Sequence, residues 1–321
     1  MKFAGVVLLA IAVATCVLVP AGMATTGTMS LTTSTTLTAD HKGSIVINAN
    51  NVTLDCAQHL VSGPGTADQD WGIIVSGRTG VTIKNCHVAG FFHGIALLGA
   101  SNTEVRGNVV TGQGANGVFS TDGVNNSFRS NEVSANGAHG IIIGSSTGGS
   151  VLSNALSGNG RGGLTILGLS SGLTVASNSA SGNGWSGIIV IASSDNQVRD
   201  NRTDNNEQSG ISLQGGVDGL DANNNLLTGN TATGNAWFGI DVAYFSAVVS
   251  GDPTSAAFSN TLKGNVATRN ALGGFGVFGA SSLNVLQDNR GRNNTNYDAL
   301  DASTGAGNTW TKNNFATTSG I

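Results

Sequence analysis

Trp185, Gln208 and Trp237 each stand two residues before a glycine that belongs to a regular series along the chain. If the segments that carry them stack like strands of a sheet, two steps of about 4.8 Å separate the indoles by about 10 Å. Aromatic faces with a polar group between them can stack successive sugar rings. Packing of the tryptophans against nearby loops is the alternative explanation of this pattern.

Polar and acidic side chains are expected near this column, because the regular spacing of the glycines is interrupted there. The interval from Gly210 to Gly239 is 29 residues, and the next, to Gly274, is 35. Long loops on a rigid scaffold are frequent sites of function. The lengthened loops and the strands before them supply Ser212, Gln214, Asp218, Asp221, Asp241, Tyr244 and Asp252. One of these carboxylates could act as a general acid or base, and solvated acids that cover an exposed edge are the alternative.

A further column, His93, Asn116 and His139, stands directly before three of the glycines. An imidazole there could act as a general base with Asp70 or Asp122 nearby. Two histidines that are two repeats apart do not share a metal ion, because each metal–nitrogen bond is only about 2.1 Å long. Hydrated turn residues explain the column as well. The sequence therefore predicts no metal site and no cofactor, and it assigns no catalytic residue.

A repeat must position all of these residues. Asn131, Asn154 and Asn178 open three similar segments that are 23 and 24 residues apart, and a glycine follows each of them nine residues later. An apolar residue stands three positions before every asparagine of the series. Extended in both directions, this first column contains Asn108, Asn131, Asn154, Asn178, Asn201, Asn230, Asn265, Asn289 and Asn313. A second column, five residues later, contains Asn136, Asn159, Asn183, Asn206, Asn235, Asn270 and Asn294.

Apolar residues alternate after each recurrent glycine, which is typical of a strand. The segments between turns are too short for helices. Stacked coils would pair their backbone groups and join their apolar sides into one core. The repeat therefore predicts an all-β parallel β-helix of about 11 to 12 coils with about 23 residues per coil. An asparagine amide can bond to its equivalent in the next coil, so both columns predict asparagine ladders.

The composition agrees with an ordered chain of turns and small side chains. Charged residues make up only 10% of the 321 residues, whereas 48 residues are glycine. The formal net charge is -4, and no cluster of lysine and arginine is present that could neutralise phosphates. Nucleic acid is therefore not an expected partner.

The first 24 residues have the layout of a secretory signal peptide. Lys2 precedes an apolar run, and Pro20 and small residues follow it. An uncleaved membrane anchor and lipidation at Cys16 are the alternatives, so membrane contact is expected only through this segment. Residues 25–38 are rich in threonine and serine and predict a short flexible tether or a frayed strand. The β-helix repeat domain is expected to cover residues 39–321.

Two cysteines remain after the first segment, Cys56 and Cys86. Matching Leu54 with Ile83 places both at the turn after equivalent strands of adjacent coils. A disulfide between neighbouring coils is then geometrically reasonable in an exported protein. We predict this bridge, and two buried free thiols are the alternative.

The segments NVTLDCAQHLVSG and GVTIKNCHVAGFFHGIALLG, and the iterated pattern N-x-x-x-G-N-G-x-x-G-I, resemble the right-handed parallel β-helix superfamily. They are most similar to the pectate-lyase-like repeats of carbohydrate-binding and sugar-hydrolase proteins and of NosD-like accessory proteins. The resemblance covers about residues 40–321 and implies a right-handed solenoid. It does not imply one activity, because the superfamily contains lyases, hydrolases, epimerases, tail spikes and adhesins. The Gly-His-Gly, Arg-Ile-Lys and Asp-Pro-His signatures of its enzymes are absent.

The strand after each recurrent glycine resembles the strand whose outward face forms the substrate groove in related enzymes. The residues expected to face outward there are Ile74, Ala96, Phe119, Ile142, Thr165, Ile189, Ser212, Asp241 and Gly276. This row contains one carboxylate and no lysine or arginine, and such sparse charge favours binding or structure over catalysis. We predict a secreted or cell-surface monomer that binds a polysaccharide or other glycan along its side. A polysaccharide lyase, epimerase or glycosidase is one alternative, and a structural or adhesive rod is another. The predicted binding residues are Trp185, Gln208, Ser212, Gln214, Trp237, Asp241 and Tyr244.

Overall fold

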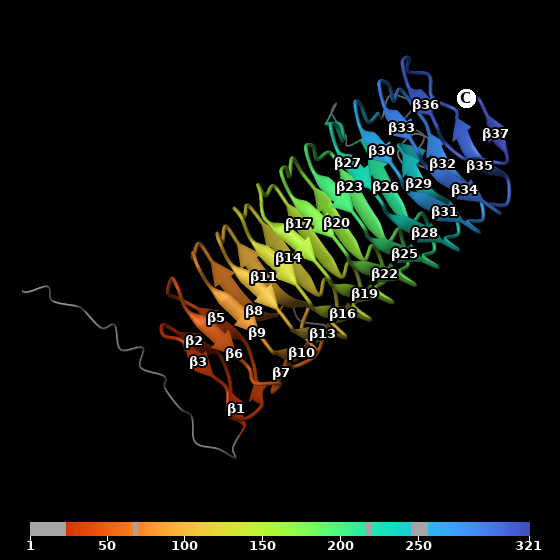
Figure 1. Cartoon of the computed structure of the whole chain (residues 1–321). Coiled ribbons are helices and arrows are strands. Elements are labelled where there is room, and N and C mark those ends of the chain that lie inside the picture. Colours follow the sequence, from red (N-terminus) through yellow and green to blue (C-terminus); the bar gives the residue numbers. More distant parts are fainter. Residues whose placement is uncertain (1–23, 67–69, 216–219, 245–255) are drawn as a thin grey trace, which may run out of the picture.

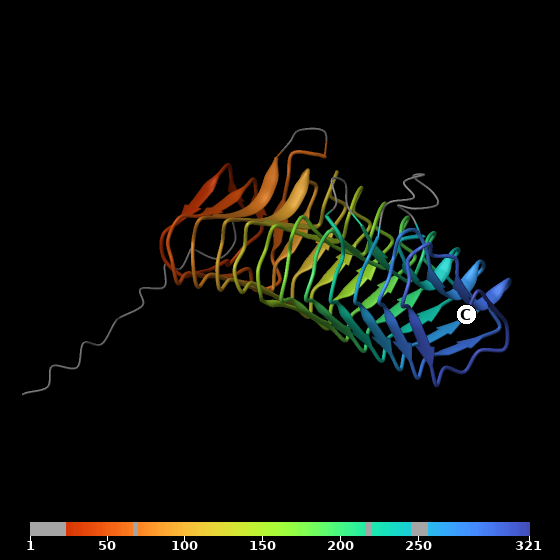
Figure 2. The ribbon, with the colours of Figure 1, turned by 90° about the horizontal axis from the view of Figure 1, so that it is seen from above.

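The computed structural model describes residues 24–66, 70–215, 220–244 and 256–321. These residues form a rod of stacked coils, in which each coil contributes one strand to each of three sheets (Figures 1 and 2). The three sheets contain 12, 13 and 12 strands, and every pair of neighbouring strands is parallel. The parallel β-helix of about 11 to 12 coils that the sequence predicts is confirmed.

Sheet A is the first of the two sheets with 12 strands. Its strands are β1 (Thr25–Thr26), β4 (His41–Lys42), β7 (Leu60–Ser62), β10 (His87–Ala89), β13 (Val109–Thr111), β16 (Glu132–Ser134), β19 (Ala155–Ser157), β22 (Ser179–Ser181), β25 (Arg202–Asp204), β28 (Thr231–Thr233), β31 (Val266–Thr268) and β34 (Arg290–Arg292).

Sheet B has 13 strands and contains the strands that follow the recurrent glycines. They are β2 (Met29–Leu31), β5 (Ile45–Ile47), β8 (Trp71–Ser76), β11 (His93–Leu98), β14 (Val118–Thr121), β17 (Ile141–Gly144), β20 (Leu164–Leu167), β23 (Ile188–Ile191), β26 (Ile211–Gln214), β29 (Phe238–Val242), β32 (Gly273–Val277), β35 (Tyr297–Asp301) and β37 (Thr318–Ser319).

Sheet C completes each coil. Its strands are β3 (Thr35–Thr36), β6 (Thr53–Asp55), β9 (Thr82–Lys84), β12 (Glu104–Arg106), β15 (Ser127–Arg129), β18 (Ser150–Leu152), β21 (Thr174–Ala176), β24 (Gln197–Arg199), β27 (Leu226–Thr228), β30 (Thr261–Lys263), β33 (Val285–Gln287) and β36 (Thr309–Thr311).

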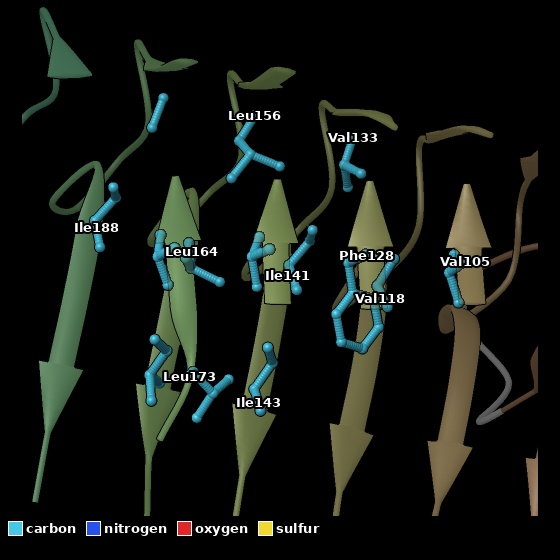
Figure 3. Packing of buried hydrophobic residues seen from close by; sticks show 14 of the residues in the cluster. Val105, Val118, Phe128, Val133, Ile141, Ile143, Leu156, Leu164, Leu173 and Ile188 are labelled. Carbon is cyan, nitrogen blue, oxygen red and sulfur yellow. The ribbon is translucent and has the colours of Figure 1, made fainter. Parts of the chain in front are cut away.

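The core runs along the inside of the rod. Because side chains alternate along a strand, the central residue of each three-residue strand of sheets A and C points inward. Val105, Phe128 and Val133 are such residues, and Ile141 and Ile143 enter the same core from sheet B (Figure 3). All five are almost completely buried. Burial of apolar surface in one continuous column therefore holds the three sheets together.

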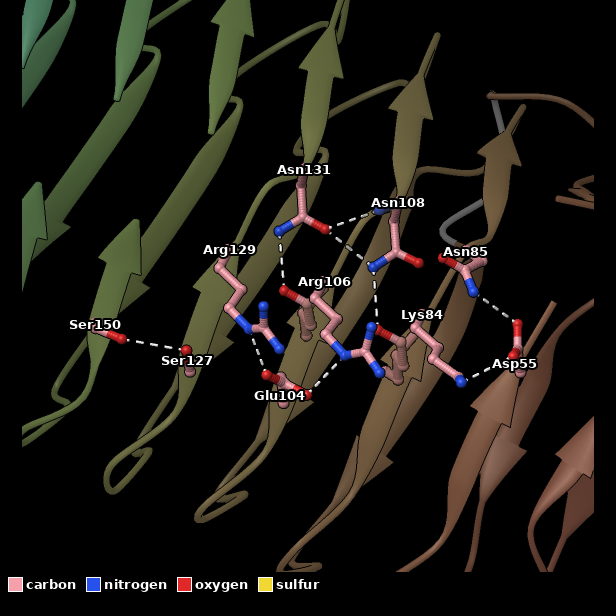
Figure 4. A network of polar contacts seen from close by, with 12 residues as sticks. Asp55, Lys84, Asn85, Glu104, Arg106, Asn108, Ser127, Arg129, Asn131 and Ser150 are labelled. Atoms are coloured by element: carbon pink, nitrogen blue, oxygen red, sulfur yellow. Dashed lines mark hydrogen bonds and ion pairs between the residues drawn. The ribbon is translucent and has the colours of Figure 1, made fainter. Parts of the chain in front are cut away.

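The predicted asparagine ladders are confirmed. Asn154 is representative: its Nδ2 donates to Asn178 Oδ1 in the next coil (2.9 Å) and to the carbonyl of Phe128 (2.9 Å). Its Oδ1 accepts hydrogen bonds from Nδ2 and the backbone N–H of Asn131 (2.9 and 3.0 Å). Figure 4 shows the start of the first ladder at Asn108 and Asn131. Each buried amide therefore has a partner in the coil before it and in the coil after it.

A third ladder occurs that the sequence analysis missed. Its members stand five residues before those of the first column, and each donates Nδ2 to the next. It contains Asn196, Asn225, Asn260, Asn284 and Asn308. Gly149 and Leu173 occupy the equivalent positions in two central coils, so the column is interrupted and its periodicity is harder to recognise.

The recurrent glycines are required because the ladder passes close to the backbone. A Cβ at Gly140 would lie 2.6 Å from the carbonyl oxygen of Gly163 and 2.9 Å from Asn159 Nδ2. Any larger residue must therefore displace the next coil or the ladder amide. This close approach explains why a glycine and an asparagine recur together.

The threonine-rich segment 25–38 was expected to be a short flexible tether or a frayed strand, and the structure shows paired strands there instead of a tether. β1, β2 and β3 pair in parallel with β4, β5 and β6, and thus form the first coil. Leu31 and Leu37 are buried in the core. Threonine is favourable in strands because its branched side chain packs on a pleated surface. The repeat domain therefore begins near Thr25 and not at residue 39. The expected signal segment lies almost wholly in residues 1–23, outside the described residues.

No helix in the described ranges is long and apolar enough to cross a bilayer.

The predicted disulfide is confirmed: Cys56 and Cys86 are bridged, with their Cα atoms 4.7 Å apart. The bridge joins the turns after β6 and β9, which are neighbours in sheet C.

We expect the bridge to be detectable by its effect on thiol reactivity. A chain that begins after residue 24 should show no alkylatable thiol when it is unfolded without reductant, and two after reduction, because Cys56 and Cys86 are its only cysteines. Mass spectrometry after alkylation measures both states. Two reactive thiols before reduction would disprove the bridge.

Candidate functional site

The outer face of sheet B carries the row of residues that the sequence suggested as a groove. Register places Thr165, Ile189, Ser212 and Asp241 side by side in successive strands. All four are buried, each with 1% of its surface exposed. This part of the face is therefore covered, and the expectation of an open row of outward side chains is wrong for these coils. Strand periodicity shows on which side a residue lies, but not what covers that side.

A buried polar chain lies in this row at β26 and β29. Gln214 Nε2 donates to Ser212 Oγ (3.0 Å), and Ser212 Oγ donates to Asp241 Oδ1 (2.9 Å). The backbone N–H of Tyr244 donates to the same carboxyl oxygen (3.1 Å). Four of the predicted residues are thus brought together.

The carboxyl group of Asp241 has an unusual environment. Burial raises its pKa to about 6, and hydrogen bonds from Ser209, Ser212 and the Tyr244 backbone partly oppose this rise. Because only 1% of Asp241 is exposed, its carboxylate cannot reach a ligand on the surface without rearrangement. The group is therefore a poor candidate for a general base.

An aromatic cluster stands next to this polar chain. Tyr244 is at its centre, with ring centroids 5.3 Å from Trp237, 5.0 Å from Phe238 and 4.9 Å from Phe278. Glycine in β32 makes room for these rings, since a Cβ at Gly273 would lie 2.5 Å from the ring of Phe238. Trp237 and Tyr244 remain half-exposed. We call Trp237, Phe238, Tyr244 and Phe278 the C-terminal cluster.

Trp185 belongs to a separate cluster. Its ring lies 5.5 Å from that of His139, and the Arg161 guanidinium carbon lies 4.9 Å from its centroid. His139 Nδ1 accepts a hydrogen bond from the backbone N–H of Gly162 (3.2 Å) and lies 2.8 Å from Thr165 Oγ1. Burial, with a smaller contribution from Arg161, lowers the pKa of His139 to about 4. We call Trp185, His139 and Arg161 the central cluster.

A third cluster includes residues that the sequence analysis did not assign to a site. Trp71 lies 5.2 Å from His93 and 5.9 Å from Phe119, and Phe92 lies 4.8 Å from His93, all between ring centroids. Trp71 stands directly before Gly72, just as His93 stands before Gly94, so the glycine register could have revealed it. We call Trp71, Phe92, His93 and Phe119 the N-terminal cluster.

The remaining described residues that the sequence predicted for the site do not join these aromatic clusters through their side chains, apart from the two histidines already described. Gln208 is half-exposed, and its backbone carbonyl accepts a hydrogen bond from the N–H of Trp237 (3.1 Å). Asp221 is half-exposed, and burial raises its pKa. Asp218 and Asp252 lie outside the described residues. The column of His93, Asn116 and His139 is joined by hydrogen bonds. Asn116 Nδ2 lies 3.3 Å from His93 Nδ1, and Asn116 Oδ1 accepts a hydrogen bond from the backbone N–H of His139 (3.0 Å).

Two surface depressions are lined by residues that do not belong to the three clusters. One, of about 480 Å³, is lined by residues of the first coils, including Thr26, Lys42 and Asp70. The other, of about 530 Å³, lies beside sheet A and includes Arg202 and Arg269. The first of them lies next to the N-terminal cluster, because the backbone carbonyl of Asp70 accepts hydrogen bonds from the N–H groups of Phe92 and His93.

Comparison with protein families agrees with the fold. The family described as a right-handed β-helix region matches residues 71–220, and the family of periplasmic copper-binding proteins (NosD) matches residues 165–320. No curated protein sequence matches this chain.

Solved structures give the same result. A variant of the periplasmic alginate epimerase AlgG has a TM-score of 0.64 at 15% identity, covering 90% of this chain and 76% of that chain. The A-module of mannuronan C-5 epimerase AlgE4 of Azotobacter vinelandii has a TM-score of 0.53 at 18% identity, covering 88% and 80%. The catalytic unit of an alpha-1,3-glucanase of Streptomyces thermodiastaticus has a TM-score of 0.61 at 11% identity, covering 92% and 62%. At these identities the likeness shows the fold alone.

The donor groups of this chain do not fit a copper site. Copper in proteins is held mainly by thiolate, thioether and imidazole groups. Residues 165–320 contain no cysteine, methionine or histidine, and Cys56 and Cys86 are joined to each other. In the described part of the chain, no three histidine, cysteine or acidic side chains are grouped closely enough to hold a metal ion.

Proposed function

Because this chain is a member of the right-handed parallel β-helix superfamily, with three aromatic clusters along one of its sheets, we propose that it binds a polysaccharide on the half-exposed rings of these clusters, along the side of the rod formed by sheet B. The observation that carries this proposal is the alignment of the clusters. They begin at β8 and end beside β32, a distance of eight coil steps or about 40 Å at about 4.8 Å per step. A row of half-exposed aromatic rings of this length suits an extended polymer.

The chemistry of the clusters suits sugars. Aromatic faces stack on the apolar faces of sugar rings, and a few polar groups between them fix the orientation. Trp185 and Trp237 supply the faces, and Gln208 stands between them in the intervening coil. The epimerases and the glucanase of similar fold are named for polysaccharide substrates, which supports the same ligand class here.

Binding is favoured over catalysis by burial. Two of the candidate bases, Asp241 and His139, are buried, with 1% and 6% of their surfaces exposed. His93 is half-exposed, but its ring packs against Trp71 and Phe92. A general base must come within hydrogen-bond distance of the proton that it removes. We therefore propose a binding protein, and assays for reducing ends and for unsaturated products on any bound polymer test the enzymatic alternative.

The proposed location is outside the cytoplasm. Disulfides persist mainly in oxidising compartments, and the bridge between Cys56 and Cys86 suits such a compartment. Export by residues 1–24, release or surface attachment, and a monomeric state remain part of this proposal. Fractionation of cells that express the full chain tests the location.

We expect Trp237→Ala to weaken binding of a ligand identified on a glycan array by about 5- to 30-fold. This factor corresponds to about 1 to 2 kcal/mol, the scale of losing one stacked aromatic ring. Isothermal titration calorimetry measures the loss. Leu226→Ala is the matched control, because Leu226 is an exposed apolar residue of sheet C. Unchanged affinity in the tryptophan variant, with the fold intact by circular dichroism, would show that this cluster does not bind the glycan.

A further inference from the structure

We infer that the polysaccharide bound along the side of the rod formed by sheet B is neutral, without carboxylate groups on its sugars. This inference rests on the proposed function and narrows its substrate class. It depends on how charge is distributed around the rod, which is uneven between the three sheets.

The loops that border sheet B are rich in acids. Asp122, Asp195 and Asp221 stand in the loops between sheets B and C, and Asp70 and Glu207 in the loops between sheets A and B. Asp122, Asp195 and Glu207 are exposed. A carboxylate polymer on this face would meet like charge, which is unfavourable and also slows association.

Few cations are available on the same side. Arg78 and Arg161 are the basic residues of the described loops bordering sheet B, apart from Arg269, which lines the depression beside sheet A. Arg161 already lies against the Trp185 ring. A polyuronate presents many carboxylates in series, and proteins bind such groups with arginine and lysine. The described residues offer no row of cations for them.

The histidines of the clusters do not supply the missing charge. Burial lowers the pKa values of both His93 and His139. His139 also accepts a hydrogen bond from the backbone of Gly162 through Nδ1, which requires that this nitrogen carries no proton. Both rings therefore contribute apolar surface and hydrogen bonds.

Basic side chains lie instead on the other two sheets. Lys84, Arg106 and Arg129 project from neighbouring strands of sheet C and are paired with Asp55 or Glu104 (Figure 4). Sheet A carries Lys42, Arg202, Arg290 and Arg292. The aromatic face is thus the acidic side of the rod, and its rings suit uncharged sugars.

The test compares neutral and charged polymers on the same protein. Affinity electrophoresis and calorimetry use dextran, laminarin and galactomannan as neutral probes, and alginate and polygalacturonate as charged probes, at low and at high sodium chloride. We expect a neutral polymer to bind with a Kd that changes less than about twofold with salt, and the uronates to bind at least about tenfold more weakly. Preferential, salt-sensitive binding of a uronate would overturn this inference and leave the proposed function standing. Binding of no polysaccharide would overturn both.

The double variant Asp122→Asn/Asp195→Asn isolates the contribution of charge. Both residues have positive φ (54° and 58°), a conformation that asparagine tolerates, so the loops should keep their shape. We expect the Kd for the neutral polymer to stay within about twofold of wild type. We expect its Kd for alginate to fall, because two like charges beside the ligand are removed. A Kd for alginate that stays unchanged would show that these carboxylates do not repel a charged polymer, and would overturn the electrostatic argument.

Discussion

Replacing Asn154 with alanine is expected to lower the free energy of unfolding by about 3 to 5 kcal/mol. The substitution leaves the backbone N–H of Asn131 and the carbonyl of Phe128 without their partners in the rod interior. Each buried polar group left unsatisfied costs about 1 to 3 kcal/mol. The substitution also removes the hydrogen bond that Asn131 Nδ2 donates to Asn154 Oδ1. Urea-induced unfolding followed by circular dichroism measures the change.

Asn48→Ala is the matched control for this substitution. Asn48 is exposed, and its side chain donates a single hydrogen bond, to Ser30 Oγ (2.7 Å) at the surface. Surface substitutions of this kind usually change stability by less than about 0.5 kcal/mol. Equal shifts of the unfolding midpoint in the two variants would refute the stabilising role of the ladder.

Asp241→Asn is expected to stabilise the protein by about 3 kcal/mol at pH 7. The pKa of Asp241 is about 6 in the folded protein, against 3.8 in the unfolded chain. Between these values the folded state holds a proton that the unfolded state has lost, so stability falls as the pH rises from about 4 to about 6. Above pH 6 both states are ionised and the full penalty of about 3 kcal/mol applies. A neutral amide avoids this penalty and still offers Oδ1 to Ser212 and Tyr244.

The measurement is the difference in unfolding free energy between wild type and Asp241→Asn at several pH values. Taking the difference cancels the contributions of other groups, including Asp55 and Glu104, whose lowered pKa values act in the opposite direction. We expect the advantage of the variant to grow from about pH 4 to about pH 6 and then to level off. A difference that is independent of pH would contradict a buried carboxylate with a raised pKa.

Periodicity explains why most of the fold could be predicted from the sequence. Each asparagine and glycine of the repeat performs the same task in every coil, so its spacing reports the length of the coil directly. The disulfide could be predicted for the same reason, because Cys56 and Cys86 follow equivalent strands. The first coil was missed because threonine replaces both asparagine and glycine in residues 25–38, and it is recognisable only through its register with Ile45 and Ile47.

The candidate site was less predictable. The repeat placed Asp241 and Ser212 correctly in one row, but it carries no information about their burial, which depends on residues outside the repeat. Trp237 and Tyr244 were expected near each other because both flank β29, and their rings are in contact. Trp185 was expected in the same site, yet its ring packs on His139, which stands two residues before β17 and two coils before the strand that follows Trp185, β23. Side-chain direction decides such contacts, and the spacing of residues does not.

The ladders also give the rod an electrical polarity. In every column Nδ2 points to the following coil and Oδ1 to the preceding one, so the amide dipoles add along the axis with their positive ends towards the C-terminus. Backbone amides do not add in this way, because Ile95 donates to the following coil whereas Thr82 donates to the preceding one. The second ladder ends where Asn294 Nδ2 donates to Asp298 Oδ1 (2.8 Å). An acidic side chain thus stands at the positive end of an aligned column of dipoles, in the same relation that acidic residues have to the first turn of an α-helix.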